Sequence, residues 1–179
     1  MKSPLDILDW ATLDEATRDA VLRRPVQRDA AGLLERARSI VADVRVRGDE
    51  ALRDYTARFD DVHLQSFAVS DAEFAAAEAV LTPVQRAALE RAIDTITRFH
   101  ELQTLPPLRL ETAPGVVCER MTVAPESVGL YVPAGTAPLP STALMLAVPA
   151  SIAGCPVRVM CTPPRPDGSA DPAVLVAAR

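Results

Sequence analysis

The stretch 126-ESVGLYVPAGTAPLPSTALMLAVPA-150 decides how the second half of this chain folds. It begins with a short apolar segment, continues into a loop rich in proline and glycine, and ends in a long apolar segment. No Asp, Glu, Lys or Arg occurs from residue 127 to residue 150. The order strand, loop, helix is typical of a parallel sheet whose faces are covered by helices.

The segments around this stretch continue the same alternation. We expect strands at residues 108–112, 116–123, 127–132 and 157–161, and helices at residues 141–153 and from 172 onward. Asp171 can cap the last helix and Pro172 can occupy its first position. The predicted fold class is therefore α/β, with a helical N-terminal region and the start of a Rossmann-like parallel sheet that is incomplete. A sheet of so few strands leaves open edges, so we expect this chain to be part of a longer one.

The first hundred residues predict helices. Capping boxes, in which Ser or Thr is followed three residues later by Glu or Gln, begin at Thr12, Ser70 and Thr82. A further helix is expected over residues 29–48, and residues 62–69 alternate loosely enough to predict a strand. The helix after Thr82 should reach about residue 102 and bury one face. That face comprises Ala88, Leu89, Ala92, Ile93, Ile96 and Phe99.

The composition changes near the two prolines at residues 106 and 107. We therefore divide the chain into an N-terminal helical arm (1–28), a mainly helical domain with short strands (29–126) and the start of a Rossmann-like domain (127–179).

The bulk properties exclude several classes of protein. The chain has 179 residues, 24% of them charged and 49% hydrophobic, and its net charge is −5, so we expect a globular protein that binds neither nucleic acid nor a membrane surface. The uncharged run of residues 127–157 contains five prolines and three glycines, which argues against a membrane-spanning helix. Cys118, Cys155 and Cys161 are an odd number without a CxxC pair, which predicts buried free thiols in a reducing, cytoplasmic compartment.

The sequence contains no common catalytic motif. HExxH, GxSxG, a P-loop and GxGxxG are all absent. His63 and His100 are the only histidines, and we expect structural or surface roles for both. The chain therefore predicts no catalytic residue and no metal ligand of its own.

The uncharged loop remains as the candidate site. Ligands of open α/β sheets bind beyond the carboxyl ends of strands, close to helix N-termini. Tyr131 would offer a ring there, Gly135 would allow close approach of the backbone, and a helix beginning at Ser141 would offer free amides. A stiff crossover packed against a neighbouring domain explains the same composition, and on the residues alone it is slightly favoured.

The loop also carries a resemblance. The run SVGLYVPAGTAPLPSTALMLAVPASIAGC, followed by VMCTPPRPDG, resembles the histidinol dehydrogenase family. Shorter matches lie upstream, at RFD (residues 58–60), RFH (98–100) and PGV (114–116), so the resemblance covers essentially the whole chain. It departs from the family at Ala134, where two glycines often follow the proline.

The resemblance implies the N-terminal part of a zinc- and NAD-dependent enzyme. Such enzymes are homodimers that oxidise L-histidinol to L-histidine through histidinal with two NAD⁺, in histidine biosynthesis. It implies that Tyr131, Pro133 and Gly135 contact NAD and that Ser141 lies near the substrate. The family's catalytic Glu-His pair and zinc ligands lie further along its sequence, so we expect this chain alone to be inactive.

Two other hypotheses for the function of the chain stay open. One is a non-enzymatic helical fragment used for interaction or oligomerisation. The other is a different NAD-linked enzyme, such as a relative of the aldehyde dehydrogenases. The lack of a cysteine nucleophile in a suitable loop counts against the latter.

Overall fold

The computed structural model describes residues 7–23, 30–134 and 137–179. The chain divides into two compact units, Met1–Gly48 and Asp49–Arg179, which are treated separately below. The division into three domains made from the sequence stays a prediction. None of the helices within the described ranges is both long enough and apolar enough to cross a membrane.

The first unit contains a 3-10 turn η1 (Trp10–Thr12) and two helices, α1 (Glu15–Leu22) and α2 (Ala30–Arg47). The capping box predicted at Thr12 is wrong. Asp14 caps α1 instead, and its Oδ1 accepts from the backbone N–H of Thr17 at 2.7 Å. The Asp14 carboxylate is the stronger acceptor at the positive end of the helix. The predicted start of α2 at Asp29 lies outside the described residues, and its predicted end at Gly48 is confirmed, where φ is +59°.

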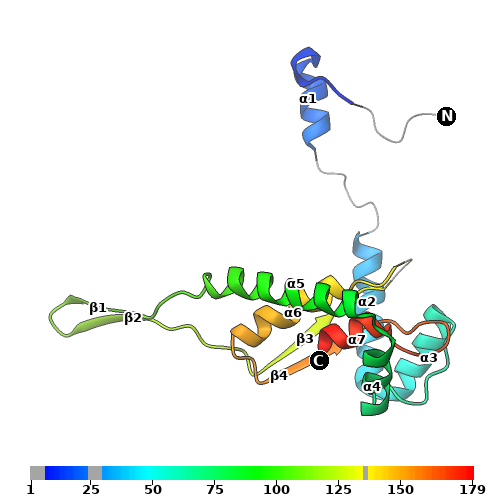
Figure 1. Ribbon diagram of the computed structural model, residues 1–179. Coiled ribbons are helices and arrows are strands. Elements are labelled where there is room, and N and C mark those ends of the chain that lie inside the picture. The colour runs from blue at the N-terminus through cyan, green and yellow to red at the C-terminus, as the bar shows by residue number, and fades with distance from the viewer. Residues whose placement is uncertain (1–6, 24–29, 135–136) are drawn as a thin grey trace. The chain divides into compact units, whose positions relative to one another are not determined.

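The second unit contains five helices and four strands within its described residues (Figure 1). The helices are α3 (Asp49–Asp60), α4 (Asp71–Val80), α5 (Pro83–Glu101), α6 (Pro140–Ile152) and α7 (Pro172–Ala178). The strands are β1 (Leu108–Ala113), β2 (Val116–Arg120), β3 (Ser127–Tyr131) and β4 (Val157–Cys161). All four predicted strands from residue 108 onward are present, although β2 ends three residues earlier than expected.

The capping boxes of α4 and α5 are both confirmed. Ser70 Oγ accepts from the backbone N–H of Glu73 at 3.3 Å, and Glu73 Oε2 accepts in return from the backbone N–H of Ser70 at 2.8 Å. Thr82 and Gln85 make the same reciprocal pair at the start of α5. These bonds satisfy amides that a helix leaves free at its first turn.

The strand predicted at residues 62–69 is absent. Val62 is buried, and the side chains of Val62 and Leu64 approach the backbone at Gly168, whose φ is +83°. Ser66 and Ala68 bond to each other in a local turn. The apolar side chains of this segment therefore pack on the loop near Gly168, and its backbone pairs with no strand.

The four strands form two separate pairs. β1 and β2 are antiparallel, with Leu110 opposite Cys118 and an irregular register between Glu111 and Ala113. β3 and β4 are parallel and in register from the Ser127–Val157 pair to the Tyr131–Cys161 pair. The predicted α/β class with an incomplete parallel sheet is confirmed, whereas the Rossmann-like connectivity stays a prediction.

The core of the second unit lies around α6. Ala143 and Leu144 of α6 are buried with Val132, which follows β3, and with two residues of α7. Leu89, Ala92 and Ile96 of α5 and Met160 of β4 pack against this cluster. Helices α5 and α6 run side by side, and α6 also contacts α7 and both parallel strands (Figure 1).

Three residues of α5 that were predicted as buried are exposed in this unit. Ala88, Ile93 and Phe99 of α5 are exposed because α5 has α6 against only one side. Met145 of α6 is 61% exposed, whereas its neighbour Leu144 is 1% exposed. The hydrophobic pattern indicated which side chains are apolar but not how many neighbouring elements cover them.

The three cysteines are free thiols, as predicted. Only Cys155 is buried, so the prediction of burial is wrong for Cys118 and Cys161. Cys118 lies on a hairpin whose strands are exposed along their whole length, and Cys161 lies at the exposed end of β4.

Replacing Leu144 with Ala should destabilise the second unit by about 2–5 kcal/mol, because it leaves a cavity in the core. Replacing the exposed neighbour Met145 with Ala is the matched control and should change stability by about 0.5 kcal/mol or less. Urea denaturation followed by circular dichroism measures both. Equal effects of the two substitutions would contradict this position of the core.

Candidate functional site

The candidate site lies at the carboxyl ends of β3 and β4. Tyr131 and Cys161 are the last residues of the two strands and are partners in the parallel register. The backbone N–H of Val132 donates to the carbonyl of Cys161 at 2.9 Å, which continues the pairing one residue further. Tyr131 is 62% exposed, whereas the adjacent Val132 is fully buried. Burial of Val132 therefore anchors the strand end while the Tyr131 ring projects from it.

The uncharged loop continues from this strand end to α6. Pro133, Ala134, Ala137 and Pro138 are exposed in the second unit. Gly135, predicted to contact a cofactor, lies outside the described residues. The described residues of the loop, which connects the buried Val132 to α6, therefore do not pack into the core.

The first turn of α6 has no side-chain cap. Leu139 occupies the N-cap position without a side-chain hydrogen bond, and Pro140 is the first helical residue. Ser141 follows and is exposed. In α7, by contrast, Asp171 Oδ1 accepts from the amides of Ala173 and Val174 at 2.9 and 3.3 Å. Pro140 has no N–H, and the amides of Thr142 and Ala143 donate to the Leu139 carbonyl at 3.0 and 3.4 Å. The start of α6 therefore keeps its partial positive charge, with Ser141 as the remaining amide of its first turn.

A tight turn follows β4. The backbone N–H of Gly168 donates to the Arg165 carbonyl, and the N–H of Arg165 donates to the Ser169 carbonyl, each at 2.8 Å. The Ser169 hydroxyl donates to Asp167 Oδ1 at 2.6 Å and the Ser169 N–H donates to it at 3.0 Å. The hydroxyl contact is the main cause that lowers the pKa of Asp167 below its ordinary value, followed by the backbone contact. The turn thus fixes an ionised carboxylate in the second strand-end loop.

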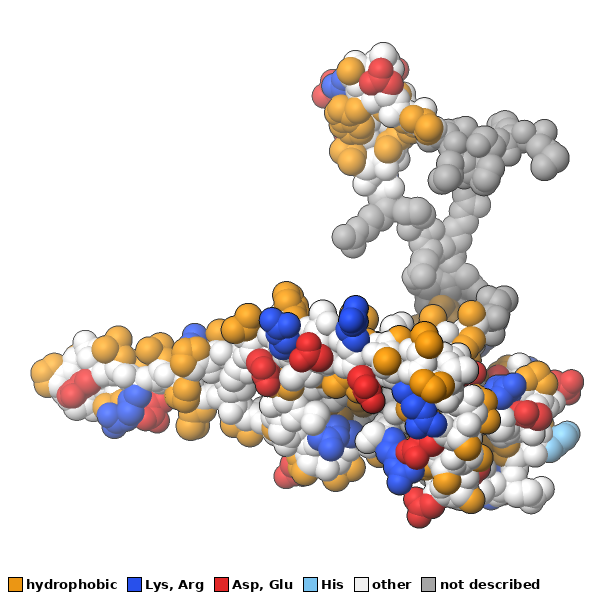
Figure 2. Space-filling model, in the orientation of Figure 1, with side chains coloured by type: hydrophobic (Ala, Val, Ile, Leu, Met, Phe, Trp, Pro, Cys, Tyr) orange, Lys and Arg blue, Asp and Glu red, His pale blue; other side chains and the backbone are white. Residues whose placement is uncertain are grey.

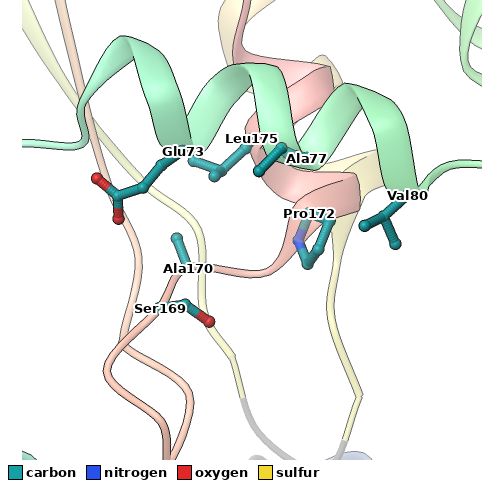
Figure 3. Close-up of a pocket in the computed structure, with 8 residues that line it drawn as sticks. Glu73, Ala77, Val80, Ser169, Ala170, Pro172 and Leu175 are labelled. Carbon is teal, nitrogen blue, oxygen red and sulfur yellow. The ribbon is translucent and has the colours of Figure 1, made fainter.

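A separate hollow of about 170 Å³ lies between α4 and the start of α7 (Figure 3). Ala77 and Val80 of α4 face Pro172 and Leu175 of α7 across it, and Ser169 and Ala170 line one end. Glu73, the acidic residue of the lining, already bonds to the N–H and hydroxyl of Ser70, and these contacts lower its pKa. The lining is mostly apolar and does not include Tyr131, Pro133 or Ser141.

The described residues contain no group of three or more His, Cys, Asp or Glu side chains arranged to hold a metal ion. His63 is exposed, and Nδ1 of His100 lies 2.7 Å from Gln103 Oε1 at the end of α5. Zinc therefore does not fit the side chains that the described segments bring together. The exposed ring of Tyr131 at the end of β3 does suit stacking on a planar aromatic ligand.

The predicted site residues that the structure describes therefore lie at the two ends of the connection between β3 and α6. Tyr131 and Pro133 lie at the end of β3, and Ser141 lies in the first turn of α6. Cys161 was not predicted to lie near these residues, and the register places it beside Tyr131. The available signal was that Cys161 ends the second strand just as Tyr131 ends the first.

A parallel strand pair crossed by a helix, with an uncharged loop at its carboxyl end, defines an α/β protein whose candidate ligand site lies at strand ends. The histidinol dehydrogenase family profile matches residues 22–179. The chain belongs to the histidinol dehydrogenase family.

Individual relatives agree with this assignment. The chain is 58% identical over 174 residues to a histidinol dehydrogenase of Xanthomonas oryzae, which aligns with 97% of this chain and 40% of that protein. It is 51% identical over 175 residues to one of Xylella fastidiosa, covering 98% of this chain and 41% of that one. The crystal structure of histidinol dehydrogenase from Elizabethkingia anophelis superposes with a TM-score of 0.85 at 36% identity, over 93% of this chain and 38% of that chain. The chain therefore spans about two fifths of the length of these relatives.

Replacing Ser169 with Ala should raise the pKa of Asp167, because the hydroxyl donor is lost, yet leave it below the ordinary value, because the Ser169 N–H still donates. The stabilisation from this contact is present above the ordinary pKa of Asp, about 4, and is lost as the pH falls through the lowered pKa. A carboxyl NMR titration measures the shift, with Ser151→Ala in α6 as the control. An unchanged pKa of Asp167 in the S169A variant would contradict the turn described here.

Proposed function

We propose that this chain is the N-terminal part of a zinc- and NAD-dependent histidinol dehydrogenase and forms one wall of its NAD site. The full reaction oxidises L-histidinol to L-histidine through histidinal with two NAD⁺, a step of histidine biosynthesis. Membership of the family supports this assignment. The observation that carries the site is the pairing of β3 and β4, which puts the exposed Tyr131 at the carboxyl end of a parallel strand pair.

The roles of individual residues follow from their positions. The Tyr131 ring offers a stacking surface and a hydroxyl, and Pro133 continues that wall along the loop. Gly135 is proposed for the same wall because glycine lets a ligand approach the backbone closely. Ser141, in the first turn of α6, is proposed to lie near the substrate. Bound NAD⁺ would supply the hydride acceptor, while these residues would bind and orient it.

The absence of charged side chains from the loop suits the proposed binding of NAD. A dinucleotide carries its own negative charge, and the partial positive charge at the start of a helix can favour a phosphate without a basic side chain. Packing within this unit does not account for the uncharged loop, because Pro133, Ala134, Ala137 and Pro138 are exposed. This exposure is compatible with a crossover that packs against another part of the protein and with a ligand-facing wall, and we propose the second.

The proposed reaction needs groups that this chain is not expected to supply. Removing the hydroxyl proton of an alcohol and activating water for attack on an aldehyde require a base, and zinc would polarise or orient substrate groups. We place the catalytic base and the zinc ligands in the part of the family's sequence that this chain does not span. We further propose a homodimer that acts in the cytoplasm, binds L-histidinol and NAD, and binds neither nucleic acid nor membranes.

An interaction or oligomerisation fragment without enzymatic function is the second candidate. It is favoured by the many large apolar side chains that stay exposed, among them Leu108, Leu110, Val116 and Val117 of the β1–β2 hairpin. Titration with NAD⁺ separates the two candidates, because the interaction fragment has no reason to bind it.

Replacing Tyr131 with Ala should weaken binding of NAD⁺ to the chain about tenfold, equivalent to about 1.4 kcal/mol, because the stacking surface is lost. Phe99→Ala is the matched control, since Phe99 is 63% exposed and Tyr131 is 62% exposed. Titration calorimetry measures both. If the unsubstituted chain binds no NAD⁺ at millimolar concentration, or if the two variants behave alike, the proposed role of Tyr131 fails.

The purified 179-residue chain should form no NADH from histidinol and NAD⁺, with or without added zinc. The reason is that the base and the zinc ligands are proposed to lie elsewhere in the family's sequence. Absorbance at the NADH band measures the reaction, and a full-length family member serves as the positive control. Histidinol-dependent NADH formation by the chain alone would refute this part of the proposal.

A further inference from the structure

We infer that the free edge of β1 pairs with the β1 edge of a second copy of this chain, in an antiparallel arrangement centred on Leu110. This inference rests on the dimeric part of the proposed function and is independent of the NAD site. The result would be a continuous four-stranded sheet in the order β2, β1, β1 of the partner, β2 of the partner.

The hairpin presents two unprotected edges, one on each strand, and the β1 edge carries the alternating charges Arg109 and Glu111. Every residue of β1 and β2 is exposed, and within the described ranges each strand is hydrogen-bonded only to the other. Hydrophobic side chains extend along the hairpin in the space-filling view, and Leu108 and Leu110 are 52% and 56% exposed (Figure 2). A two-stranded hairpin is marginal in water by itself, and an unpaired edge is a template for another strand.

The charge pattern selects the second copy as the occupant of this edge. Two-fold antiparallel pairing centred on Leu110 puts Arg109 opposite Glu111 of the other copy, twice by symmetry. Centring the pairing on Arg109 or on Glu111 would instead place that residue opposite its own copy. Opposite charges across strands stabilise a pair and like charges destabilise it, so one register is favoured over its neighbours.

Charged side chains also protect edge strands from pairing, and this is the ordinary explanation for Arg109 and Glu111. Protection against self-pairing needs like charges opposite each other, however, and the Leu110-centred register brings opposite charges together. Arg109 already contacts Glu119 of β2 at 2.7 Å, and Glu111 Oε1 accepts from the backbone N–H of Gly115 at 2.8 Å, so the pairing would use Oε2 of Glu111. In the paired sheet Arg109 would lie between two carboxylates, Glu119 of its own chain and Glu111 of the other.

The other face of the proposed four-stranded sheet is equally compatible with this pairing. Leu110 lies opposite Cys118 in the hairpin, so the pairing would create a central row of four uncharged side chains, Cys118 and Leu110 from each copy. Because one strand edge buries little area, we expect a weak dimer, with a Kd on the order of 10–100 µM.

Cysteine cross-linking tests the register. The two Leu110 Cα atoms would lie about 4.5–5.5 Å apart, within disulfide range, whereas the two Leu108 Cα atoms would lie about 14 Å apart. The background is Cys118→Ser, Cys161→Ser, which removes the cysteine opposite Leu110 and the other exposed thiol. In this background, the Leu110→Cys variant should form a disulfide-linked dimer under mild oxidation. Leu108→Cys, on the same face and equally exposed, should not. Equal cross-linking of the two variants, or none of either, would overturn the proposed register.

Charge exchange tests the occupant. The E111R variant carries Arg at both positions and should dimerise at least about tenfold more weakly than the unsubstituted chain. The R109E/E119R variant keeps the pair within the hairpin but carries Glu at positions 109 and 111, and should be weakened similarly. Mixing the two variants should restore dimerisation, because each presents the complement of the other, and the triple variant R109E/E111R/E119R should dimerise with itself.

Sedimentation velocity measures all these forms, and circular dichroism checks that each is folded. A monomeric unsubstituted chain at several hundred micromolar, or dimerisation unaffected by E111R, would refute the hairpin as the dimer surface. Titration of E111R with NAD⁺ should match that of the unsubstituted chain, since the hairpin contains none of the proposed NAD-contacting residues. Failure of the hairpin proposal is therefore distinguishable from failure of the proposed NAD site.

Discussion

The burial of one face of α6 is the constraint on which the second unit depends. Parallel strands cannot be joined by a tight turn, so β3 and β4 can become neighbours only through a crossover that packs back on them. Ala143 and Leu144 provide that packing against Val132, and α5 and α7 close the same cluster. Burying a leucine side chain contributes about 1.5–3 kcal/mol, which is large compared with the net stability of a domain. The packing of α6 therefore fixes the end of β3, and with it the position of Tyr131, although Tyr131 is not part of α6.

The same packing leaves the other face of the parallel pair uncovered. Alternate residues of the two strands lie on one face, and there Tyr131, Val157, Val159 and Cys161 are exposed. Parallel sheets are usually covered on both faces. The proposed cofactor wall thus adjoins an apolar surface that the second unit does not fill, and the family's relatives are more than twice as long as this chain. An NAD site assembled from several parts of a longer chain is consistent with this arrangement.

Local signals predicted the elements well where residues with fixed roles mark their ends. Ser70 and Thr82 accept amides in the first turn of their helices, and Asp171 with Pro172 begins α7, so these starts could be read from the sequence. The strand predicted at residues 62–69 failed because alternation alone does not supply a neighbouring strand. The exposure of Phe99 was missed for a related reason, since helical periodicity indicates an apolar face but not what lies against it.

The places of the candidate site residues in the fold were predictable, but the neighbour of Tyr131 was not. The order of strand, loop and helix placed Tyr131 at a strand end and Ser141 in a first helical turn. That Cys161 lies beside Tyr131 depends on the register of β3 with β4, and the sequence indicated only that each residue lies near the end of its strand. The absence of charge from residues 127–150 now divides into two causes. In α6 it reflects the core around Leu144. In the loop it does not reflect the core, because the described loop residues are exposed; their neutrality is compatible with a surface outside this unit or with a ligand.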